Sequence, residues 1–358
     1  MKITREKLYS RQTVLEDIGP EGQEKLLRTR VAVVGCGGLG NFVAIQLAAS
    51  GVGHLHLVDY DRVSESNLHR QVFFRTEDIG QLKAEMLADH VRQISPFVKT
   101  SLGLEPLTKK NISKQLDGYD LVVDCTDSLP TKYLLNDFCV LTDKILVYGS
   151  LYKHDGYVCS FNLPQEEGRS ANLRDAFAHP PEKGIPNCSE VGTLNPIVGL
   201  IGSLQSNEVI KIITGSGVPL ANKMLIYNSM QNRQFTMSLS SRFNKSEIGK
   251  LFHSETYFDA RCAEQDPKLL ITPEKLKSQL GEVSILSVVE NADLGLPFEA
   301  DFRIPYSKFD AGEFSLEASR DLVVVCNKGI TSYEITQRIK SAHPDLRVLS
   351  LDGGLEKF

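Results

Sequence analysis

The feature that most constrains the fold is residues 31–41, VAVVGCGGLGN, where an apolar run ends in glycines spaced G-x-G-x-x-G. Gly35 allows a tight turn, Gly37 lets the backbone approach a phosphate, and Gly40 lets the following helix pack on the strand. The amino end of that helix offers free N–H groups and a positive dipole end to an anion. Asp59 lies 19 residues after Gly40, at the end of the apolar run HLHLVD, where a carboxylate can bind ribose hydroxyls. These residues predict a nucleotide site where a strand turns into a helix.

Apolar runs alternate with helix-like segments through most of the chain before residue 240. Strands that are apolar on both faces are typical of a parallel sheet with helices on both sides. We therefore expect an α/β fold with a Rossmann-like, doubly wound, mostly parallel sheet, followed by a smaller α/β unit. The predicted strands lie near 31–34, 54–59, 98–102, 121–127 and 145–150, and the predicted helices include 6–28, 38–50 and 83–94.

The chain beyond the predicted sheet is organised differently. Residues 165–186 are polar and rich in Pro and Gly, which predicts a mobile loop. Residues 240–268 are polar and show little periodicity, whereas strand and helix signals resume from about 269. We predict a nucleotide-binding domain at 1–245, a linker at 246–268 and a second domain at 269–358.

The composition excludes several classes of function. The chain has 358 residues, 41% of them hydrophobic and 24% charged, which predicts a soluble protein with room for two domains. Its net charge of −5 gives no reason to expect nucleic acid or a membrane as a partner. The start, MKITREKLYSRQ, is too polar for a signal peptide. The most apolar later stretch, 194–215, contains Gln205, Glu208 and Lys211, so it predicts a buried helix and no membrane span.

The cysteines indicate a reducing compartment. Seven are scattered along the chain, and no two form a C-x-x-C pair. The odd number and wide spacing argue against a disulfide framework and for a cytoplasmic protein without a cysteine zinc site. We expect Cys36, Cys125, Cys139 and Cys159 to be packing residues.

The glycine motif alone favours NAD or FAD, but the charges that follow it favour a triphosphate. Arg70 and Lys83 place two cations near the predicted phosphates, and Asn67 adds an amide. A nicotinamide enzyme has only a diphosphate to hold and needs residues for hydride transfer, of which no set appears. Two cations with a further carboxylate, Asp127 in LVVDCTD, suit a triphosphate with Mg²⁺. Ligands of open α/β sheets gather at the carboxyl edge of the strands, where Asp127 is expected.

Residues 9–239 closely resemble the MoeB/ThiF (HesA) family, relatives of ubiquitin-activating enzymes. The matching stretches are YSRQ, GCGGLGN, VDYDRVSESNLHRQ, GQLKAE, DCTDS, PNCSEVGTLNPIVGLIGSLQSNEVIK and LIYN. The resemblance implies an adenylyltransferase that binds ATP and Mg²⁺. Its substrate would be the C-terminal Gly-Gly carboxylate of a small ubiquitin-fold sulfur-carrier protein, activated for thiocarboxylate formation in molybdopterin or thiamine biosynthesis. A cysteine desulfurase or another sulfur donor is an implied partner.

The resemblance also assigns roles by position. Gly37 and Gly38 would line the phosphates, and Asp59 would bind the ribose. Arg11 matches an arginine that reaches into the ATP site of the partner subunit, which implies a homodimer. The implied catalytic residues are Arg11, Arg70, Lys83, Asp127, Cys188 and Cys326. The implied nucleotide-binding residues are Gly37, Gly38, Asp59, Asp61, Ser66, Asn67, Arg70, Lys83, Asp127 and Ser128, with Mg²⁺ held at Asp127.

The chain departs from the family pattern at two places. Most relatives carry two C-x-x-C pairs that bind a structural zinc. Here residues 172–175 are Asn-Leu-Arg-Asp, and SLSSRFNKSEIGK after the last strand has no cysteine. We therefore predict no zinc. Cys188, in PNCSEVG, matches the conjugation cysteine of the family, and both a covalent role and a packing role are open.

Residues 269–358 resemble a degenerate rhodanese domain. The match is carried by CNKGITS at 326–332 and by LDGGLEKF at the end of the chain. In rhodaneses this loop wraps backbone N–H groups around a cysteine persulfide, which would make Cys326 a sulfur carrier. Asn327 and Thr331 stand where rhodaneses often have arginines, so both an active and an inactive domain are open.

Two other functions compete with carrier adenylation. A divergent member could adenylate a peptide or an amino acid at the same site. A scaffold that binds the carrier without catalysis is the third hypothesis. The intact charged residues speak against it: Arg11, Asp59, Arg70, Lys83 and Asp127.

Overall fold

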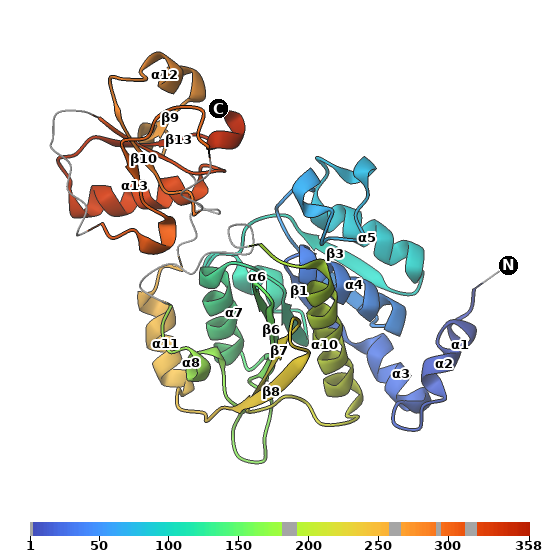
Figure 1. Ribbon diagram of the computed structural model, residues 1–358. Helices are drawn as coiled ribbons and strands as arrows, with labels where there is room; N and C mark the ends of the chain where they lie inside the picture. Colours follow the sequence, from blue (N-terminus) through green and yellow to red (C-terminus); the bar gives the residue numbers. More distant parts are fainter. Residues whose placement is uncertain (1–2, 181–191, 258–265, 291–294, 312–320) are drawn as a thin grey trace. The chain divides into compact units, whose positions relative to one another are not determined.

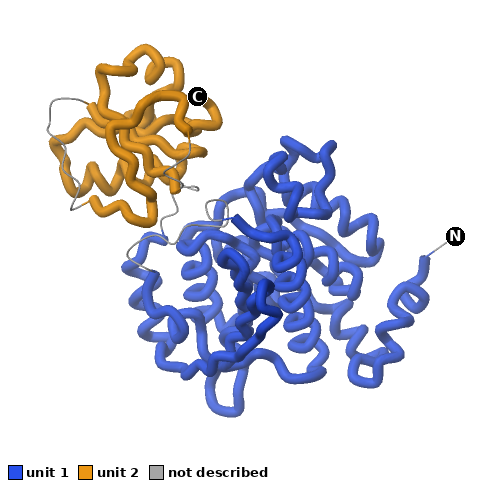
Figure 2. The backbone as a smooth tube through the Cα atoms, viewed as in Figure 1, with its two compact units in different colours: residues 1–180, 192–257 blue, residues 181–191, 258–358 orange. Residues whose placement is uncertain are grey.

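The computed structural model describes residues 3–180, 192–257, 266–290, 295–311 and 321–358. They form two compact units, of which the first contains residues 1–180 and 192–257 and the second contains the described part of 258–358 (Figure 2). Among these residues no helix combines the length and the apolar character that crossing a bilayer requires.

The first unit is built on an eight-stranded sheet with the order β3-β2-β1-β4-β5-β6-β7-β8 (Figure 1). β1 to β5 are parallel, and β5 to β8 are antiparallel. The chain winds outward from β1 to β3 and then continues on the other side of β1, so the predicted doubly wound, mostly parallel sheet is confirmed. The strands are β1 Arg30–Val34, β2 His54–Val58, β3 Lys99–Gly103, β4 Leu121–Asp124, β5 Ile145–Tyr152, β6 Asp155–Phe161, β7 Lys223–Asn228 and β8 Arg233–Ser238.

Strand β1 shows why both faces of the sheet are buried. Val31 and Val33 join one apolar cluster, whereas Ala32 and Val34 join another, because successive side chains of a strand point to opposite faces. Helices cover each cluster, as the apolar runs predict. The first face is covered by α3 Gly19–Arg28, α4 Gly38–Ser50, α5 Lys83–Ile94 and α10 Asn195–Thr214, and the second by α6 Ile112–Leu116, α7 Leu129–Leu141, α8 Leu173–Ala176 and α11 Lys245–Ser254.

The prediction of a single helix over residues 6–28 is wrong. The segment forms three helices, α1 Arg5–Leu8, α2 Ser10–Thr13 and α3, with turns between them. Gly19 has a φ of +57°, and Pro20 occupies the first turn of α3. A proline has no N–H to donate, so it starts a helix more readily than it continues one.

Two segments predicted to lack structure contain helices. Residues 172–176, within the predicted mobile loop, form the amino cap and the body of α8, where Leu173 and Arg174 are buried. Helix α11 begins inside the predicted first domain and runs through residues 246–254 of the predicted linker, packing on α7. Both helices begin with a capping box, Asn172 with Asp175 and Asn244 with Glu247, and this local signal outweighs their weak apolar periodicity.

The second unit holds a five-stranded parallel sheet with the order β11-β10-β12-β13-β9. Strands and helices alternate in this unit, as the signals from about residue 269 predict. The elements are β9 Leu270–Ile271, α12 Pro273–Ser278, β10 Ser284–Ser287, β11 Phe302–Arg303, β12 Leu322–Val325, α13 Ile330–Ala342 and β13 Val348–Leu351, with short 3₁₀ turns at Pro267–Leu269, Tyr306–Lys308 and Leu355–Lys357.

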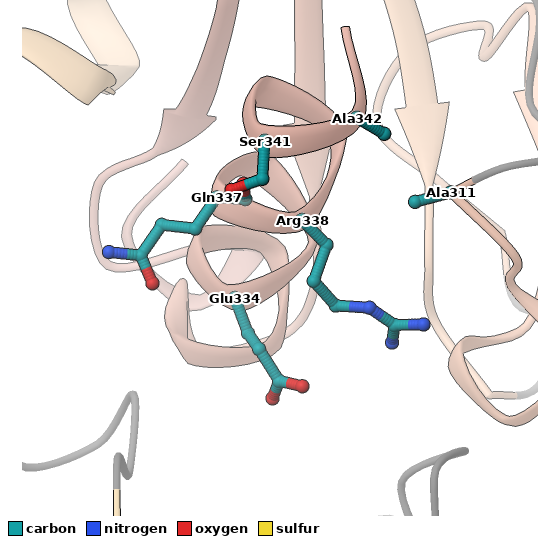
Figure 3. A pocket seen from close by; sticks show the side chains of 6 residues that line it. All are labelled: Ala311, Glu334, Gln337, Arg338, Ser341 and Ala342. Carbon is teal, nitrogen blue, oxygen red and sulfur yellow. The ribbon is translucent and has the colours of Figure 1, made fainter. Parts of the chain in front are cut away.

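A cavity of about 570 Å³ lies against α13 in the second unit (Figure 3). Two of its charged side chains have partners inside the unit: Glu334 accepts a hydrogen bond from Tyr306, and Arg338 lies over the ring of Phe309. The predicted nucleotide residues are not among those that line this cavity.

Candidate functional site

The predicted nucleotide site lies where the strand order reverses, between the carboxyl ends of β1 and β4. Gly35 follows β1 with a φ of +90°, and its N–H donates to Val58 at the end of β2 (2.8 Å). A Cβ atom at Gly35 would stand 2.8 Å from the carbonyl oxygen of Cys125, so only glycine fits there. The glycine loop and the loop after β4 are therefore in backbone contact.

The next glycines have different surroundings. A side chain at Gly40 would overlap the carbonyl of Gly35, which keeps α4 close to the strand as predicted. Gly37 is the amino cap of α4 and forms no side-chain capping bond, and the nearest side-chain atom to a Cβ there would be Nε2 of Gln71, at 3.5 Å. Gly38 begins the helix. The first N–H groups of a helix have no partner within the helix, so the start of α4 can present them to an anion beside Gly37.

Asp59, directly after β2, is tied to the glycine loop. Its Oδ2 accepts a hydrogen bond from the N–H of Cys36 (2.7 Å), and its Oδ1 accepts one from the N–H of Asp61 (2.8 Å). Burial raises the pKa of Asp59 to about 6, and the neighbouring carboxylate of Asp61 adds to this. Each carboxylate oxygen has a second acceptor position, so Asp59 can also accept a hydroxyl.

Lys83 is the first residue of α5 and is only 6% exposed. Its Nζ lies 2.8 Å from Oδ2 of Asp61. Burial favours the neutral amine, but the carboxylates of Asp59 and Asp61 outweigh burial and raise the pKa of Lys83, and Asp127 contributes in the same direction. The structure thus brings Lys83 together with three of the predicted acidic residues, and the ammonium stays charged.

The remaining predicted residues lie on two segments at the same edge. Asn67 is buried at the end of the 3₁₀ turn Glu65–Asn67, whereas Ser66 is exposed. Arg70 is partly exposed, and its Nη1 donates to the carbonyl of Ser66 (3.0 Å). Asp127 is exposed in the loop after β4, and Ser128 is the amino cap of α7.

Two site residues were missed by the sequence analysis. Asn41 is fully buried on α4, and its Oδ1 accepts the N–H of Phe73, so it holds the segment after Arg70 beside the glycine helix. Gln71 is 3% exposed, and its Oε1 has no hydrogen-bond partner among the described residues. Both lie inside quoted motifs, GCGGLGN and NLHRQ, so their position next to the glycines was the available signal.

Gln71 tests whether the site suits a nucleotide. A buried amide oxygen without a partner is unfavourable by about 1–3 kcal/mol, and native proteins seldom leave one. The amide adjoins Gly37, where no side chain fills the space. The unpaired oxygen accepts a hydrogen bond, so its missing partner must be a donor, such as a ribose hydroxyl or the adenine amino group of a nucleotide. Lys83 would supply the positive charge that phosphates need, so the residues present fit a nucleotide.

Arg11 makes no contact with the other predicted nucleotide-site residues that the structure describes. It is exposed on α2, which packs on α3, and no contact among the described residues joins its side chain to Asp59, Lys83 or Asp127. Cys188 and Cys262 fall outside the described residues. Cys36, Cys125, Cys139 and Cys159 are free and buried, and burial raises the pKa of each thiol, which confirms the packing role predicted for them.

Cys326 occupies a second candidate site, at the carboxyl end of β12. It is 5% exposed, and its Sγ accepts the backbone N–H of Ser332 (3.2 Å) and lies 3.3 Å from the Oγ of the same residue. Ser350 on β13 donates to Ser332 Oγ (2.9 Å), and both serines are fully buried. Gly329 turns the loop with a φ of +77° against Gly353 and Gly354. The loop thus directs a backbone N–H at the sulfur, and the thiol donates to the hydroxyl oxygen of Ser332.

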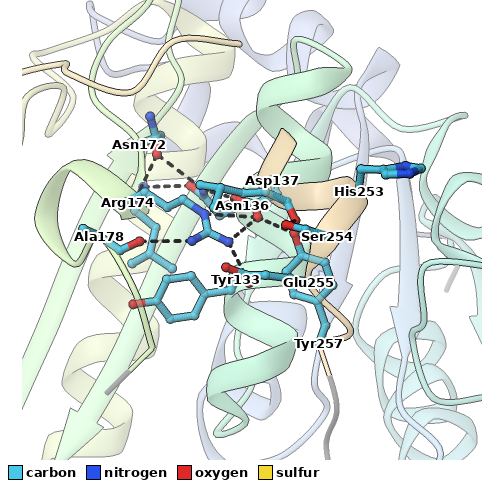
Figure 4. A network of polar contacts seen from close by, with 12 residues as sticks. Tyr133, Asn136, Asp137, Asn172, Arg174, Ala178, His253, Ser254, Glu255 and Tyr257 are labelled. Carbon is cyan, nitrogen blue, oxygen red and sulfur yellow. Dashed lines mark hydrogen bonds and ion pairs between the residues drawn. The ribbon is translucent and has the colours of Figure 1, made fainter. Parts of the chain in front are cut away.

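The segments that lack the family's cysteines are joined by polar contacts. Asp175 Oδ1 accepts the N–H groups of Arg242 (2.6 Å) and Phe243 (2.9 Å), and Asn172 donates to the carbonyl of Phe243 (3.3 Å). Beside them Arg174 is fully buried against Asp137 (2.6 Å) and Glu255 (2.9 Å) (Figure 4). Hydrogen bonds therefore connect α8 to the chain after β8. No group of three or more potential metal-ligating side chains occurs among the residues that the structure describes.

Known proteins resemble this chain along most of its length. A family model described as the ThiF family matches residues 9–248. A sulfur carrier protein adenylyltransferase of Thermus thermophilus is 43% identical over 235 residues, which cover 64% of this chain and 87% of that protein. A protein of Mycobacterium tuberculosis named "Probable adenylyltransferase/sulfurtransferase MoeZ" is 34% identical over 355 residues, which cover 95% of this chain and 90% of that protein.

A solved structure shares the fold. The crystal structure of E. coli MccB with ATP superposes with a TM-score of 0.58 and 22% identity, covering 66% of this chain and 72% of that one. The family model spans more than half of the chain, and its matched residues include the whole glycine loop and the segments that carry Asp59, Lys83 and Asp127. This chain therefore belongs to the ThiF family.

Proposed function

We propose that this protein adenylates the C-terminal Gly-Gly carboxylate of a ubiquitin-fold sulfur-carrier protein, for thiocarboxylate formation in molybdopterin or thiamine biosynthesis. The observation that carries the proposal is the grouping of Lys83 with Asp59, Asp61 and Asp127 beside an open glycine loop. The names of the relatives support the choice of substrate, because one is a sulfur carrier protein adenylyltransferase.

Each predicted residue receives a role at this edge of the sheet. Gly37 and Gly38 line the phosphates, and Asp59, with Asp61 behind it, binds the ribose. The triphosphate is held by Ser66, Asn67, Arg70 and Lys83. Asp127 holds Mg²⁺, and Ser128 caps α7 behind it. A bound Mg²⁺ supplies Lewis-acid neutralisation of the phosphate oxygens.

The chemistry explains why these residue types are needed. An anionic carboxylate approaches the α-phosphate of a polyanion, and the negative charge on the phosphate oxygens must be balanced as the new bond forms. Lys83 and Arg70 are held in place before the reaction, so their charges act without reorganisation. The carrier's carboxylate oxygen bonds to the α-phosphorus, and pyrophosphate leaves with the electron pair of the broken P–O bond. The residues contribute position and charge, with no covalent step of their own.

The active form in this proposal is a homodimer in which Arg11 completes the ATP site of the partner subunit. Arg11 is exposed on α2, and the described part of the chain shows no contact between its side chain and the other site residues, which suits an arginine that acts in the partner. We place the dimer in the cytoplasm and assign it neither a nucleic acid nor a membrane as a partner.

In this proposal the second unit, domain 269–358, transfers sulfur to the activated carrier protein. A persulfide on Cys326, loaded by a cysteine desulfurase or another sulfur donor, attacks the acyl carbon and displaces AMP. A thiol then reduces the S–S bond and releases the thiocarboxylate, and Cys188 is the candidate for a covalent link to the carrier.

Cys326→Ala is expected to abolish thiocarboxylate formation and to leave adenylation unchanged. Mass spectrometry of the carrier measures both products. If the variant formed as much thiocarboxylate as the wild type, this role would be ruled out.

The protein is proposed to need no zinc. Asn172 donates to the backbone of residues 242–243, and Asp175 accepts hydrogen bonds from it, so these bonds join the two segments in which the family's cysteine pairs stand. Metal analysis of the purified protein tests this directly, and stoichiometric zinc would contradict it.

The experiment that tests the main proposal is the exchange of pyrophosphate into ATP. We expect exchange to require Mg²⁺ and to be stimulated by a carrier that ends in Gly-Gly, and a carrier without its last two glycines is the matched control. Exchange stimulated equally by both carriers would refute the proposed substrate. Stimulation by a free amino acid or a short peptide instead would favour the divergent activity.

A further inference from the structure

A buried ion pair lies at the start of the loop that carries Asp127, and the mechanism above does not use it. Asp124 is the last residue of β4 and is fully buried, and Lys132 on α7 is 3% exposed. Lys132 Nζ lies 3.0 Å from Asp124 Oδ2. Burial favours the neutral amine, but Asp124 outweighs burial and raises the pKa of Lys132. Lys132 therefore stays protonated beside the Asp124 carboxyl group within the core of the first unit.

The other polar atoms of the pair are also occupied. Lys132 Nζ donates to the carbonyl of Gly149 on β5 (2.7 Å) and stands 4.7 Å from the centre of the Tyr148 ring. Asp124 Oδ1 accepts both the backbone N–H (3.0 Å) and the hydroxyl (2.8 Å) of Thr126. One oxygen of Asp124 thus holds the helix, and the other holds the first turn of the Asp127 loop.

This loop also contacts the glycine loop. The N–H of Cys125 donates to the carbonyl of Val34 (2.8 Å), and a Cβ atom at Gly35 would stand 2.8 Å from the Cys125 carbonyl oxygen. On the other side, Gln205 donates to the carbonyl of Asp124 (2.8 Å). The segment from Asp124 to Thr126 therefore has no room to shift without moving the glycine loop or losing these bonds.

Stability alone does not account for such a pair. Removing two charges from water is unfavourable by several kcal/mol for each ion, and well-packed apolar residues are often as stable or more stable in their place. What the ion pair supplies is a fixed geometry, because Asp124 has defined partners for each carboxylate oxygen. We propose that Asp124 and Lys132 are positioning residues of the adenylation site, whose ion pair sets the place of Asp127 relative to the glycine loop.

The proposal rests on the role of Asp127 proposed above, and its test separates the two. Lys132→Met removes the charge and keeps the length of the side chain, and Lys132→Arg restores a cation. The matched control is Lys144→Met, since Lys144 Nζ also donates to backbone carbonyls, of Asp117 and Tyr119, but away from the Asp127 loop. Asp124→Asn is the second variant, should Lys132→Met fail to fold.

Hydrogen–deuterium exchange of the nucleotide-free protein is the first readout. The amides of residues 125–128 are expected to exchange at least about tenfold faster in Lys132→Met and Asp124→Asn than in the wild type. Lys132→Arg is expected to recover most of the protection, and Lys144→Met to leave this segment unchanged. Unchanged exchange at 125–128 in a folded Lys132→Met or Asp124→Asn protein overturns the proposal.

The affinity for ATP, measured by equilibrium dialysis with and without Mg²⁺, is the second readout. The gain in affinity that Mg²⁺ produces is expected to fall about tenfold in Lys132→Met, whereas the affinity for ATP alone changes less than about threefold, because a displaced Asp127 affects only the ion. If hydrogen–deuterium exchange became faster in Lys132→Met but Mg²⁺ still raised the affinity for ATP as in the wild type, the link between the ion pair and Asp127 would be overturned. If Mg²⁺ did not raise the affinity of the wild type for ATP, the proposed role of Asp127 would be refuted instead, and hydrogen–deuterium exchange would still test the ion pair.

Discussion

Charged side chains gather in two parts of the first unit, and their surroundings differ. At the nucleotide edge Lys83 is buried, but its partner Asp61 is 54% exposed, and Asp127 is exposed as well. In the network of Figure 4, Arg174 and Asp137 are both 0% exposed, and Arg174 donates to Asp137, Glu255 and the carbonyl of Ala178. The first arrangement has carboxylates that a ligand can reach from solvent, whereas the second buries its charges against one another. Charge alone therefore does not identify the nucleotide edge, and exposure helps to identify it.

We expect the largest loss of activity from replacing Lys83, which lies at the nucleotide edge. Lys83→Ala removes the cation that faces Asp59, Asp61 and Asp127, so the site becomes repulsive to ATP and the charge on the reacting phosphate is unbalanced. We expect carrier-dependent pyrophosphate exchange to fall by about 100-fold to 1000-fold. Lys25→Ala is the control, because Lys25 Nζ donates to the carbonyl of Thr214 and lies outside the site. Wild-type exchange in Lys83→Ala would remove the role assigned to this lysine.

The network of Figure 4 is expected to respond in the opposite way. Arg174→Met leaves the Asp137 carboxyl group buried and without its ion-pair partner, which should lower the free energy of unfolding by about 3–5 kcal/mol. Exchange activity per folded molecule should not change. Arg169→Met is the control, since its ion pair with Asp143 is partly exposed and is expected to contribute about 1 kcal/mol or less. Urea unfolding measures both, and equal losses in the two variants would show that burial does not distinguish them.

Gln71 sharpens the comparison at one residue. Gln71→Leu replaces a buried amide whose Oε1 is unpaired, so the unfolding free energy of the nucleotide-free protein should stay the same or rise. Its affinity for ATP should fall about tenfold, because the ligand loses a partner. Gln23→Leu is the matched control: its amide is 5% exposed and fully paired, with Gln12 and the carbonyl of Ser50. The control should lose stability and keep its affinity for ATP. Unchanged affinity in Gln71→Leu would separate this amide from the ligand.

Much of the fold could be predicted because its signals are local. The apolar run at β1 and the glycine spacing after it determine the turn, and the boundaries of α5 match the predicted helix 83–94. The errors lie where other forces dominate. Pro20 and Gly19 divide the first helix, and capping boxes at Asn172 and Asn244 form helices in stretches with little apolar periodicity.

The site could be predicted only in part. The motifs located Asp59 and Lys83, and the parallel topology brings both to one edge with Asp127. The pairing of Lys132 with Asp124 depends on the packing of α7 against β4 and β5, which no local spacing encodes. The missing partner of Gln71 is a property of the folded chain, because it requires knowing every neighbour of one oxygen atom.

The smallest expected effect concerns the protonation of Asp59. Burial raises its pKa from the ordinary 3.8 to about 6, so the folded protein binds a proton that the unfolded chain releases between these values. The contribution of this group to stability is therefore fully present below about 3.8 and is lost as the pH rises through about 6. Binding of a ribose hydroxyl needs the carboxylate, so affinity should change in the opposite direction and decline by up to about tenfold for each pH unit below 6. Adenosine is the suitable ligand, because it has no phosphate that titrates. Asp59→Asn is the control, and it should flatten the pH profiles of both stability and adenosine affinity, since every other titratable group is shared by the two proteins. If the adenosine affinity of the wild type were constant from pH 5 to 8, Asp59 would not be the residue that binds the ribose.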